Sequence, residues 1–153
     1  MAKIRGKYGQ IYLIAAIVII ALIVGLFAVA NYSKKKESTK VKDLAKELRE
    51  ESSQVINYEI YSSDSKIEEF TNNFSSYAGD EVEIYYLVGN MSSFDVYTHD
   101  NGAKQIYNNF SQNASTIILS VHGSNYNFNL REGKNFYFVM YQELQGEIYV
   151  ETS

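Results

Sequence analysis

Residues 11–30 of this chain form an uninterrupted apolar run, IYLIAAIVIIALIVGLFAVA, that contains no charged residue. In an α-helix each residue adds about 1.5 Å, so the run would extend about 30 Å, which matches the hydrocarbon thickness of a bilayer. The run therefore predicts a transmembrane helix over residues 10–30. Membrane lipids are then expected to be a partner of the chain, which crosses the bilayer once.

A cleaved secretory signal is the alternative interpretation of this run. Such signals also start with basic residues, here Lys3, Arg5 and Lys7, but their apolar stretch is only about 7–15 residues and ends at a small-residue cleavage site. The present run is longer and leads into the polar, basic segment 31–36, so we expect a retained anchor. Ala21 and Gly25 have the small-xxx-small spacing that lets membrane helices approach closely, which makes them candidates for helix association.

Charge is divided unevenly along the chain. The formal net charge is −4, but residues 1–50 sum to +6 and residues 51–153 to −10. The basic part flanks the apolar run and suits anionic lipid headgroups, whereas the acidic part argues against nucleic-acid binding, which needs a basic surface. Cysteine is absent, which excludes disulfides and thiolate metal ligands.

Two helices are predicted after the run. Apolar residues recur close to every 3.6 positions within the helix extension 31–60, and no Pro or Gly lies between residues 25 and 79. We therefore predict one continuous helix over about 10–60. A second helix follows, with Ser65 and Glu68 as a capping box and Gly79 at its end. Its apolar face is predicted to consist of Ile67, Phe70, Phe74 and Tyr77.

From Glu81 onward the pattern becomes that of β-strands. Apolar residues at the even positions of 82–88 alternate with Glu81 and Glu83, which we expect to face solvent. Asp100–Gly102 is a turn signal, and 104–114 is ambiguous. Further strands are predicted at 94–98, 116–121, 126–130, 135–141 and 146–150. The fold class is α+β: a long N-terminal helix, a short second helix, and an antiparallel β-sheet whose apolar face packs on helix in a domain at 61–153.

Three features together resemble an archaeal pilin-like protein with a class III signal peptide. They are a short basic leader at 1–9, the pair Gly9–Gln10 directly before the apolar helix, and a β-rich domain after a long helix. The resemblance implies that a prepilin peptidase cleaves between Gly9 and Gln10, and that the chain associates with other pilin-like subunits. Family members often carry Ser and Glu where this chain has Tyr12 and Ile14, so weak or dependent assembly is expected.

The orientation in the membrane follows from two signals that disagree. Three Lys or Arg residues precede the helix and seven follow it closely, and this charge count alone favours the opposite topology, with the domain in the cytoplasm. The resemblance implies a domain outside the cytoplasm, and this orientation is preferred. Asn-x-Ser sequons suit an exposed, glycosylated surface protein, although Asn- and Ser-rich loops also produce them. They occur at Asn31, Asn73, Asn90, Asn109 and Asn113.

Motifs for catalysis or metal binding are weak. His99–Asp100 resembles a metal-binding dipeptide, but His122 is the only other histidine, and Asp100 is better explained as a turn residue. No glycine-rich phosphate loop and no Gly-x-Ser-x-Gly motif is present, so no catalytic residue and no cofactor are assigned. The prediction is a non-enzymatic, membrane-anchored, pilin-like surface protein with a structural, adhesive or assembly role. The alternative is a single-pass anchored binding or sensory module that does not polymerise.

Overall fold

The computed structural model describes residues 5–62, 65–144 and 146–153, so the predicted leader residues 1–4 lie outside it. The chain divides into two compact units, residues 1–39 and residues 40–153. The helices are α1 (Arg5–Ser62) and α2 (Ile67–Ala78). The strands are β1 (Glu83–Asn90), β2 (Ser93–Asp100), β3 (Ala103–Ile106), β4 (Phe110–Gln112), β5 (Thr116–Val121), β6 (Ser124–Asn129), β7 (Asn135–Leu144) and β8 (Glu147–Thr152). The predicted α+β class is confirmed.

The first unit consists of the N-terminal part of α1. Helix α1 runs without a break from Arg5 to Ser62, as expected for a segment with neither proline nor an interior glycine after Gly25. Within the predicted anchor, every side chain at 14–29 is exposed, and most are large and apolar. Among the residues that the structure describes, no helix is long and apolar enough to cross a membrane.

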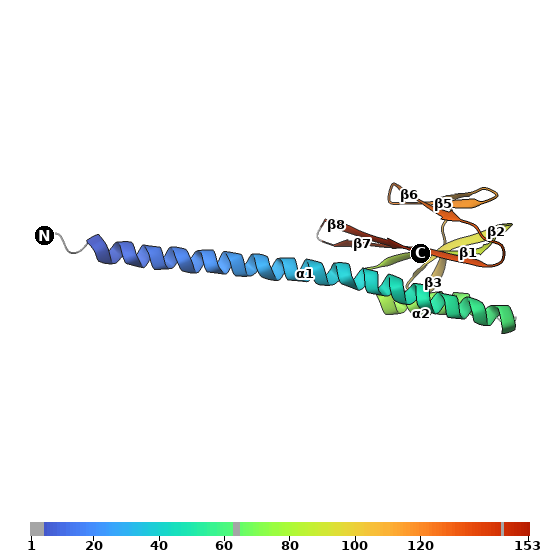
Figure 1. Ribbon diagram of the computed structural model, residues 1–153, viewed down its shortest axis with the longest axis horizontal. Helices are drawn as coiled ribbons and strands as arrows, with labels where there is room; N and C mark the ends of the chain where they lie inside the picture. The colour runs from blue at the N-terminus through green and yellow to red at the C-terminus, as the bar shows by residue number, and fades with distance from the viewer. Residues whose placement is uncertain (1–4, 63–64, 145) are drawn as a thin grey trace. The chain divides into compact units, whose positions relative to one another are not determined.

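The second unit has three layers. A five-stranded antiparallel sheet, in the order β3-β2-β1-β7-β8, forms the middle layer. Helix α2 and residues 40–62 of α1 lie on one face of this sheet, and the three-stranded sheet β4-β5-β6 lies on the other (Figure 1). The ambiguous segment 104–114 supplies most of β3 and all of β4. The middle sheet is therefore covered by helix on one side and by sheet on the other.

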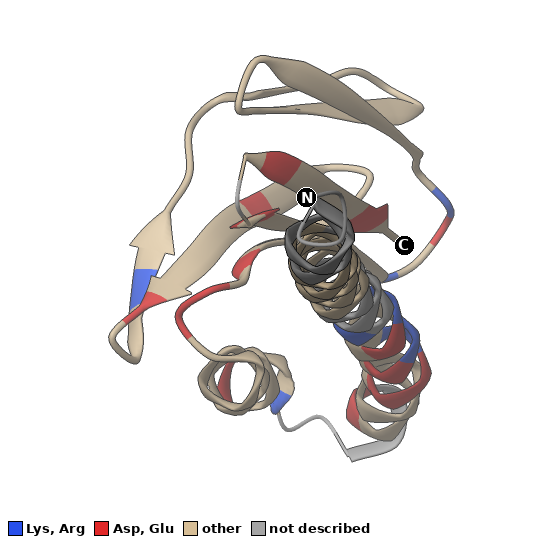
Figure 2. Cartoon of the chain, turned by 90° about the vertical axis from the view of Figure 1, so that its left-hand side faces the viewer, with Lys and Arg blue, Asp and Glu red and all other residues tan. Residues whose placement is uncertain are grey.

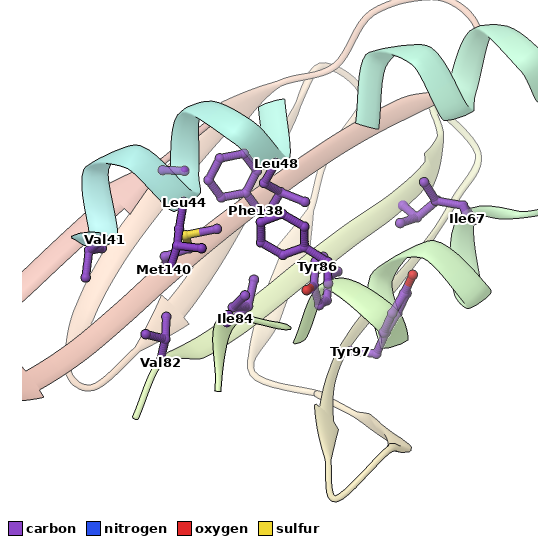
Figure 3. Packing of buried hydrophobic residues seen from close by; sticks show 14 residues of the cluster. Val41, Leu44, Leu48, Ile67, Val82, Ile84, Tyr86, Tyr97, Phe138 and Met140 are labelled. Carbon is purple, nitrogen blue, oxygen red and sulfur yellow. The ribbon is translucent and has the colours of Figure 1, made fainter. Parts of the chain in front are cut away.

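The core between the helices and the middle sheet combines an apolar stripe of α1 with alternate residues of the strands. Val41, Leu44 and Leu48 recur every three or four positions of α1 and contribute to this core. They face Phe138 and Met140 of β7, as Figure 3 shows. Each such side chain contributes about 1.5–3 kcal/mol when fully buried, so this stripe ties the helix to the sheet.

A second core lies on the opposite face of the middle sheet. Tyr85 and Leu87 of β1 and Val139 of β7 pack there against Ile117 and Leu119 of β5. The sequence predicted one apolar face packed on helix, but both faces are buried. The prediction was incomplete because strand alternation assigns residues to faces without showing which faces are covered. Glu81 and Glu83 are exposed, as predicted.

The buried stripe of α2 differs from the predicted one. The structure buries Ile67, Thr71, Phe74 and Ala78, while Phe70 is half-buried and Tyr77 is 65% exposed. Phe70 still packs against the core between the helices and the middle sheet, so the predicted face was wrong at Tyr77 alone. Its apolar pattern excluded Thr71, whose burial is tolerated because its hydroxyl is hydrogen-bonded inside the core.

The start of α2 is held by the end of α1. The predicted capping box of Ser65 and Glu68 is wrong, because the N-cap residue is Lys66. The amides of Lys66 and Ile67 instead donate to Glu59 Oε1 of α1, at 2.5 and 2.7 Å. Lys134, from the turn before β7, donates to Glu59 Oε2. A carboxylate of the preceding helix therefore replaces the predicted capping box.

Glu59 is ionised in this environment. Its side chain is only 6% exposed. Burial by itself raises the pKa of the Glu59 carboxyl, but the hydrogen bond from Lys134, the Ile67 amide, the Lys134 charge and the Lys66 amide together lower the pKa below its ordinary value of 4.5. The ionised form therefore stabilises the folded state.

The two phenylalanines of α2 should differ in their contribution to stability. Phe74→Ala removes a ring that is 4% exposed and should lower the free energy of unfolding by about 3–5 kcal/mol. Phe70→Ala removes a half-buried ring and should cost clearly less. Urea denaturation of both variants measures the difference, and equal losses would place the core stripe where the sequence predicted it.

Glu59→Gln should make stability less dependent on acid. Because the folded-state pKa of Glu59 is lowered, its contribution is fully present above the ordinary pKa of 4.5 and is lost as the pH falls through the folded-state value. The wild type should therefore have a higher free energy of unfolding than the variant near neutral pH, and this difference should become smaller in acid. The exposed Glu81→Gln is the matched control. A difference that stays constant across denaturation curves down to about pH 3 would contradict the assignment.

Candidate functional site

A hydrogen-bonded network joins α2 to β1 and β2. The fully buried Thr71 Oγ1 lies 3.2 Å from the hydroxyl of Tyr97 and 3.0 Å from Nε2 of His99, and it donates to the carbonyl of Glu68 at 3.0 Å. The hydroxyl of Tyr86 donates to the carbonyl of Thr71 at 3.2 Å. The seam between α2 and the sheet is therefore polar, although its surroundings are apolar.

These bonds assign the protons of the network. The single hydroxyl proton of Thr71 is used on the Glu68 carbonyl, so Thr71 Oγ1 accepts from Tyr97 and from a protonated His99 Nε2. His99 Nδ1 then carries no proton, and it is buried without a hydrogen-bond partner among the described residues, as is Asn72 Oδ1. Two hydrogen-bond acceptors at this seam are therefore left without donors.

The titrating groups of the network are neutral at physiological pH. Burial lowers the pKa of His99 below its ordinary value of 6.5, with Glu68 opposing the shift and Lys104 adding to it. Burial raises the pKa of Tyr97 to about 12. The seam therefore acts through hydrogen bonds between neutral groups.

A hollow of about 680 Å³ opens beside this network. Its walls are the last turn of α2, the first residues of β1 and the turn between β2 and β3. Asp80, Glu83 and Asp100 give the lining three carboxyl groups, His99 adds its ring, and no Lys or Arg lines it. The hollow therefore offers mainly hydrogen-bond acceptors and negative charge, which suit a donor-rich or cationic group.

One carboxylate of the hollow is held by the opposite sheet. Glu83 Oε2 accepts from the hydroxyl of Tyr85 at 2.8 Å and lies 2.9 Å from Nε2 of His122, in the β5–β6 turn. The ring of His122 stacks on Tyr141 with centroids 4.0 Å apart. His122 thus holds the small sheet on the middle sheet and does not join His99. Among the described residues, no group of three or more His, Asp or Glu side chains converges as a metal site.

The predicted turn at Asp100–Gly102 is confirmed. Asn101 and Gly102 both have positive φ, 48° and 77°, the conformation of a tight hairpin turn between β2 and β3. This turn brings Asp100 to the rim of the hollow. The role of Asp100 beside a turn, which the sequence favoured over a metal ligand, agrees with this position.

The residues predicted for processing and helix association all lie on α1. Gly9 and Gln10 are within the helix, but their surroundings are outside the described part of the structure. Ala21 and Gly25 are exposed, and a Cβ added at Gly25 would have no atom within 4 Å. The structure therefore leaves space for a neighbouring helix at Gly25.

Four of the predicted glycosylation sites are exposed. Asn90 and Asn113 use Oδ1 to accept from turn amides, whereas Asn109 uses Nδ2, the atom that would carry a sugar, to donate to the Ser120 carbonyl at 3.1 Å. Asn73 lies on α2, where the next residue, Phe74, is buried. Asn90 and Asn113 are therefore the better-placed acceptors, and the side chain of Asn31 is not described.

The sequence did not predict a groove between α1 and α2. Glu47 and Glu51 of α1 and four residues of α2 line this groove of about 340 Å³. Basic and acidic residues are interspersed on α1 between residues 40 and 51 (Figure 2). The sequence feature that could have indicated this groove is the helical spacing of Phe70 and Tyr77. That spacing instead predicted part of the buried face of α2. The α2 residues of the groove are Phe70, Asn73, Phe74 and Tyr77.

Comparison of the chain with protein-family models, curated proteins and solved structures finds no match. No relative therefore supports or opposes the resemblance to archaeal pilin-like proteins.

His99→Gln should reduce the pH dependence of stability near neutrality. Because the pKa of His99 is lowered on folding, its contribution to stability is present above the ordinary value of 6.5 and is lost as the pH falls through the folded-state pKa. The wild type should therefore weaken more than the variant between about pH 7 and pH 5 in urea denaturation. Identical curves for wild type and His99→Gln would contradict the network.

Proposed function

We propose that this chain is a membrane-anchored, pilin-like surface protein with a structural, adhesive or assembly role and without enzymatic activity. The observation that carries the proposal is the uncharged run 11–30, in which every described side chain, those at 14–29 and Tyr12, is exposed. Contiguous apolar surface of this extent is rare on soluble monomers and marks contact with lipid or protein. Lipid hydrocarbon and neighbouring helices are the environments that such a run prefers.

Further support comes from the residues around the run. Basic residues on both sides suit anionic headgroups, and the open space at Gly25 suits close approach of another pilin-like subunit. The Gly9–Gln10 pair is the proposed site for a prepilin peptidase. We place the domain outside the cytoplasm, where the exposed sequons at Asn90 and Asn113 would be available for glycosylation.

An anchored binding or sensory module that does not polymerise is the second candidate. The observation that favours it is the hollow of about 680 Å³ with its acidic rim and its neighbouring acceptors without donors. A pocket of this size falls within the range of small-molecule sites. The two candidates share the anchor and differ in processing and in association between copies.

Processing at Gly9 separates these candidates. In an archaeal host with a prepilin peptidase, the wild-type chain should lose residues 1–9, and Gly9→Val should retain them because the bulky side chain blocks the cleavage site. Gly9→Ala keeps a small residue and is the matched control. Intact-mass measurement of membrane-extracted protein reads the result. A full-length wild-type mass, equal to that of Gly9→Val apart from the substitution, would favour the simple anchor.

The same cells test the orientation. Protease added to intact cells should remove the domain of the wild-type protein while a cytoplasmic marker remains whole. Complete protection before lysis and digestion after lysis would place the domain in the cytoplasm, as the charge count favours.

A further inference from the structure

The groove between α1 and α2 combines aromatic rings with carboxylates. The ring centroids of Phe70 and Phe74 are 6.0 Å apart, and those of Phe74 and Tyr77 are 5.9 Å apart, so the rings form a row along α2. Glu47 and Glu51 lie one helical turn apart on the α1 side of the groove. Neither glutamate has an ion-pair partner among the described residues.

The same domain already binds a lysine with this combination of groups. Lys104 Nζ lies 4.4 Å from the ring centroid of Tyr97 and 3.1 Å from Glu68 Oε2. A lysine ammonium is attracted both to an aromatic face and to a carboxylate, while its aliphatic stem covers apolar surface. The groove therefore has the chemistry of a lysine site, with its own lysine missing among the lining residues.

The chain presents lysines at the spacing that this groove requires. Lys42 and Lys46 are exposed on α1 and are four residues apart, as are Glu47 and Glu51. Lys46 forms an ion pair with Glu50, with a nitrogen–oxygen distance of 3.9 Å. Both side chains are largely exposed, so this ion pair contributes little to stability. The lysine pair and the glutamate pair are offset by five residues, or about 140° around the helix, so the lysines face away from their own groove.

We propose that the groove binds the Lys42–Lys46 face of a second copy of this chain. Glu47 and Glu51 of one copy are one helical turn apart, and Lys42 and Lys46 of the other copy have the same spacing, so the two pairs of opposite charge match. The aliphatic stems of the lysines pack on the row of aromatic rings. Because the groove and the lysine face are different surfaces, the contact is heterologous and leaves one of each surface free. Successive copies can therefore add in one direction, which deepens the proposed assembly role and rests on it.

The absence of cysteine in the chain permits a direct test with the full-length protein in its membrane. Two differently tagged copies, Glu51→Cys and Lys46→Cys, are coexpressed and oxidised mildly. We expect a mixed disulfide dimer at about fivefold or more the level given by Lys46→Cys with the exposed Glu132→Cys. A mixed dimer no more abundant than this control, or an equally strong Glu51→Cys homodimer, would overturn the proposal.

Charge exchange tests the pairing independently. The double variant Glu47→Lys with Glu51→Lys should self-associate less in chemical cross-linking, and so should Lys42→Glu with Lys46→Glu. Coexpression of the two double variants should restore the cross-link, because each supplies the charge that the other lacks. Lys42, Lys46 and Glu51 are exposed and Glu47 is half-buried, and unchanged near-ultraviolet circular dichroism verifies folding. Failure of restoration in folded variants would overturn the proposal.

These results can be separated from the test of the proposed function. A retained leader or a cytoplasmic domain would count against the pilin-like role, whatever the groove does. Normal processing and an external domain together with a negative cysteine pair would overturn only the groove contact. Asn73 lies in the groove, so a glycan found there by mass measurement of assembled protein would also overturn it.

Discussion

Burial of the middle sheet on both faces is the constraint on which the domain depends. β1 lies at the centre of this sheet, paired with β2 on one side and β7 on the other. Its residues alternate between two cores, with Ile84 and Tyr86 toward the helices and Tyr85 and Leu87 toward the small sheet. Neither layer can leave without exposing one face of β1, so helices and small sheet stabilise the same strand from opposite sides.

The polar seam of α2 follows from this packing. Once α2 is pressed onto β1 and β2, the hydroxyls of Thr71, Tyr86 and Tyr97 must find partners inside the core: the Thr71 hydroxyl pairs with that of Tyr97, and the Tyr86 hydroxyl donates to the Thr71 carbonyl. Burying Thr71 sets the rotation of α2 about its axis. The same rotation turns Tyr77 outward into the groove. The candidate interaction surface is therefore a consequence of how the hydrogen bonds of the buried hydroxyls are satisfied in the core.

Elements set by local sequence were largely predictable. The absence of proline and glycine after Gly25 predicted the uninterrupted helix α1, Asn101–Gly102 predicted the hairpin turn, and the strand at 116–121 was predicted with its observed limits. The cap of α2 was not, because the capping carboxylate, that of Glu59, lies on α1 and is itself bound by Lys134, which is 75 residues further along the chain. Neither the hollow nor the groove was predicted, since each is assembled from several elements.

The sequence by itself determined the apolar run, the periodicity of each element and the separation of basic from acidic residues. These are properties of neighbouring residues, and backbone geometry converts them directly into helix, strand and turn. Only the tertiary structure decided which side of α2 is buried, that both faces of the middle sheet are covered, and where the carboxylates of Glu47, Glu51 and Glu59 lie. The physical reason is that burial and hydrogen-bond satisfaction depend on contacts between distant segments, which no local pattern specifies.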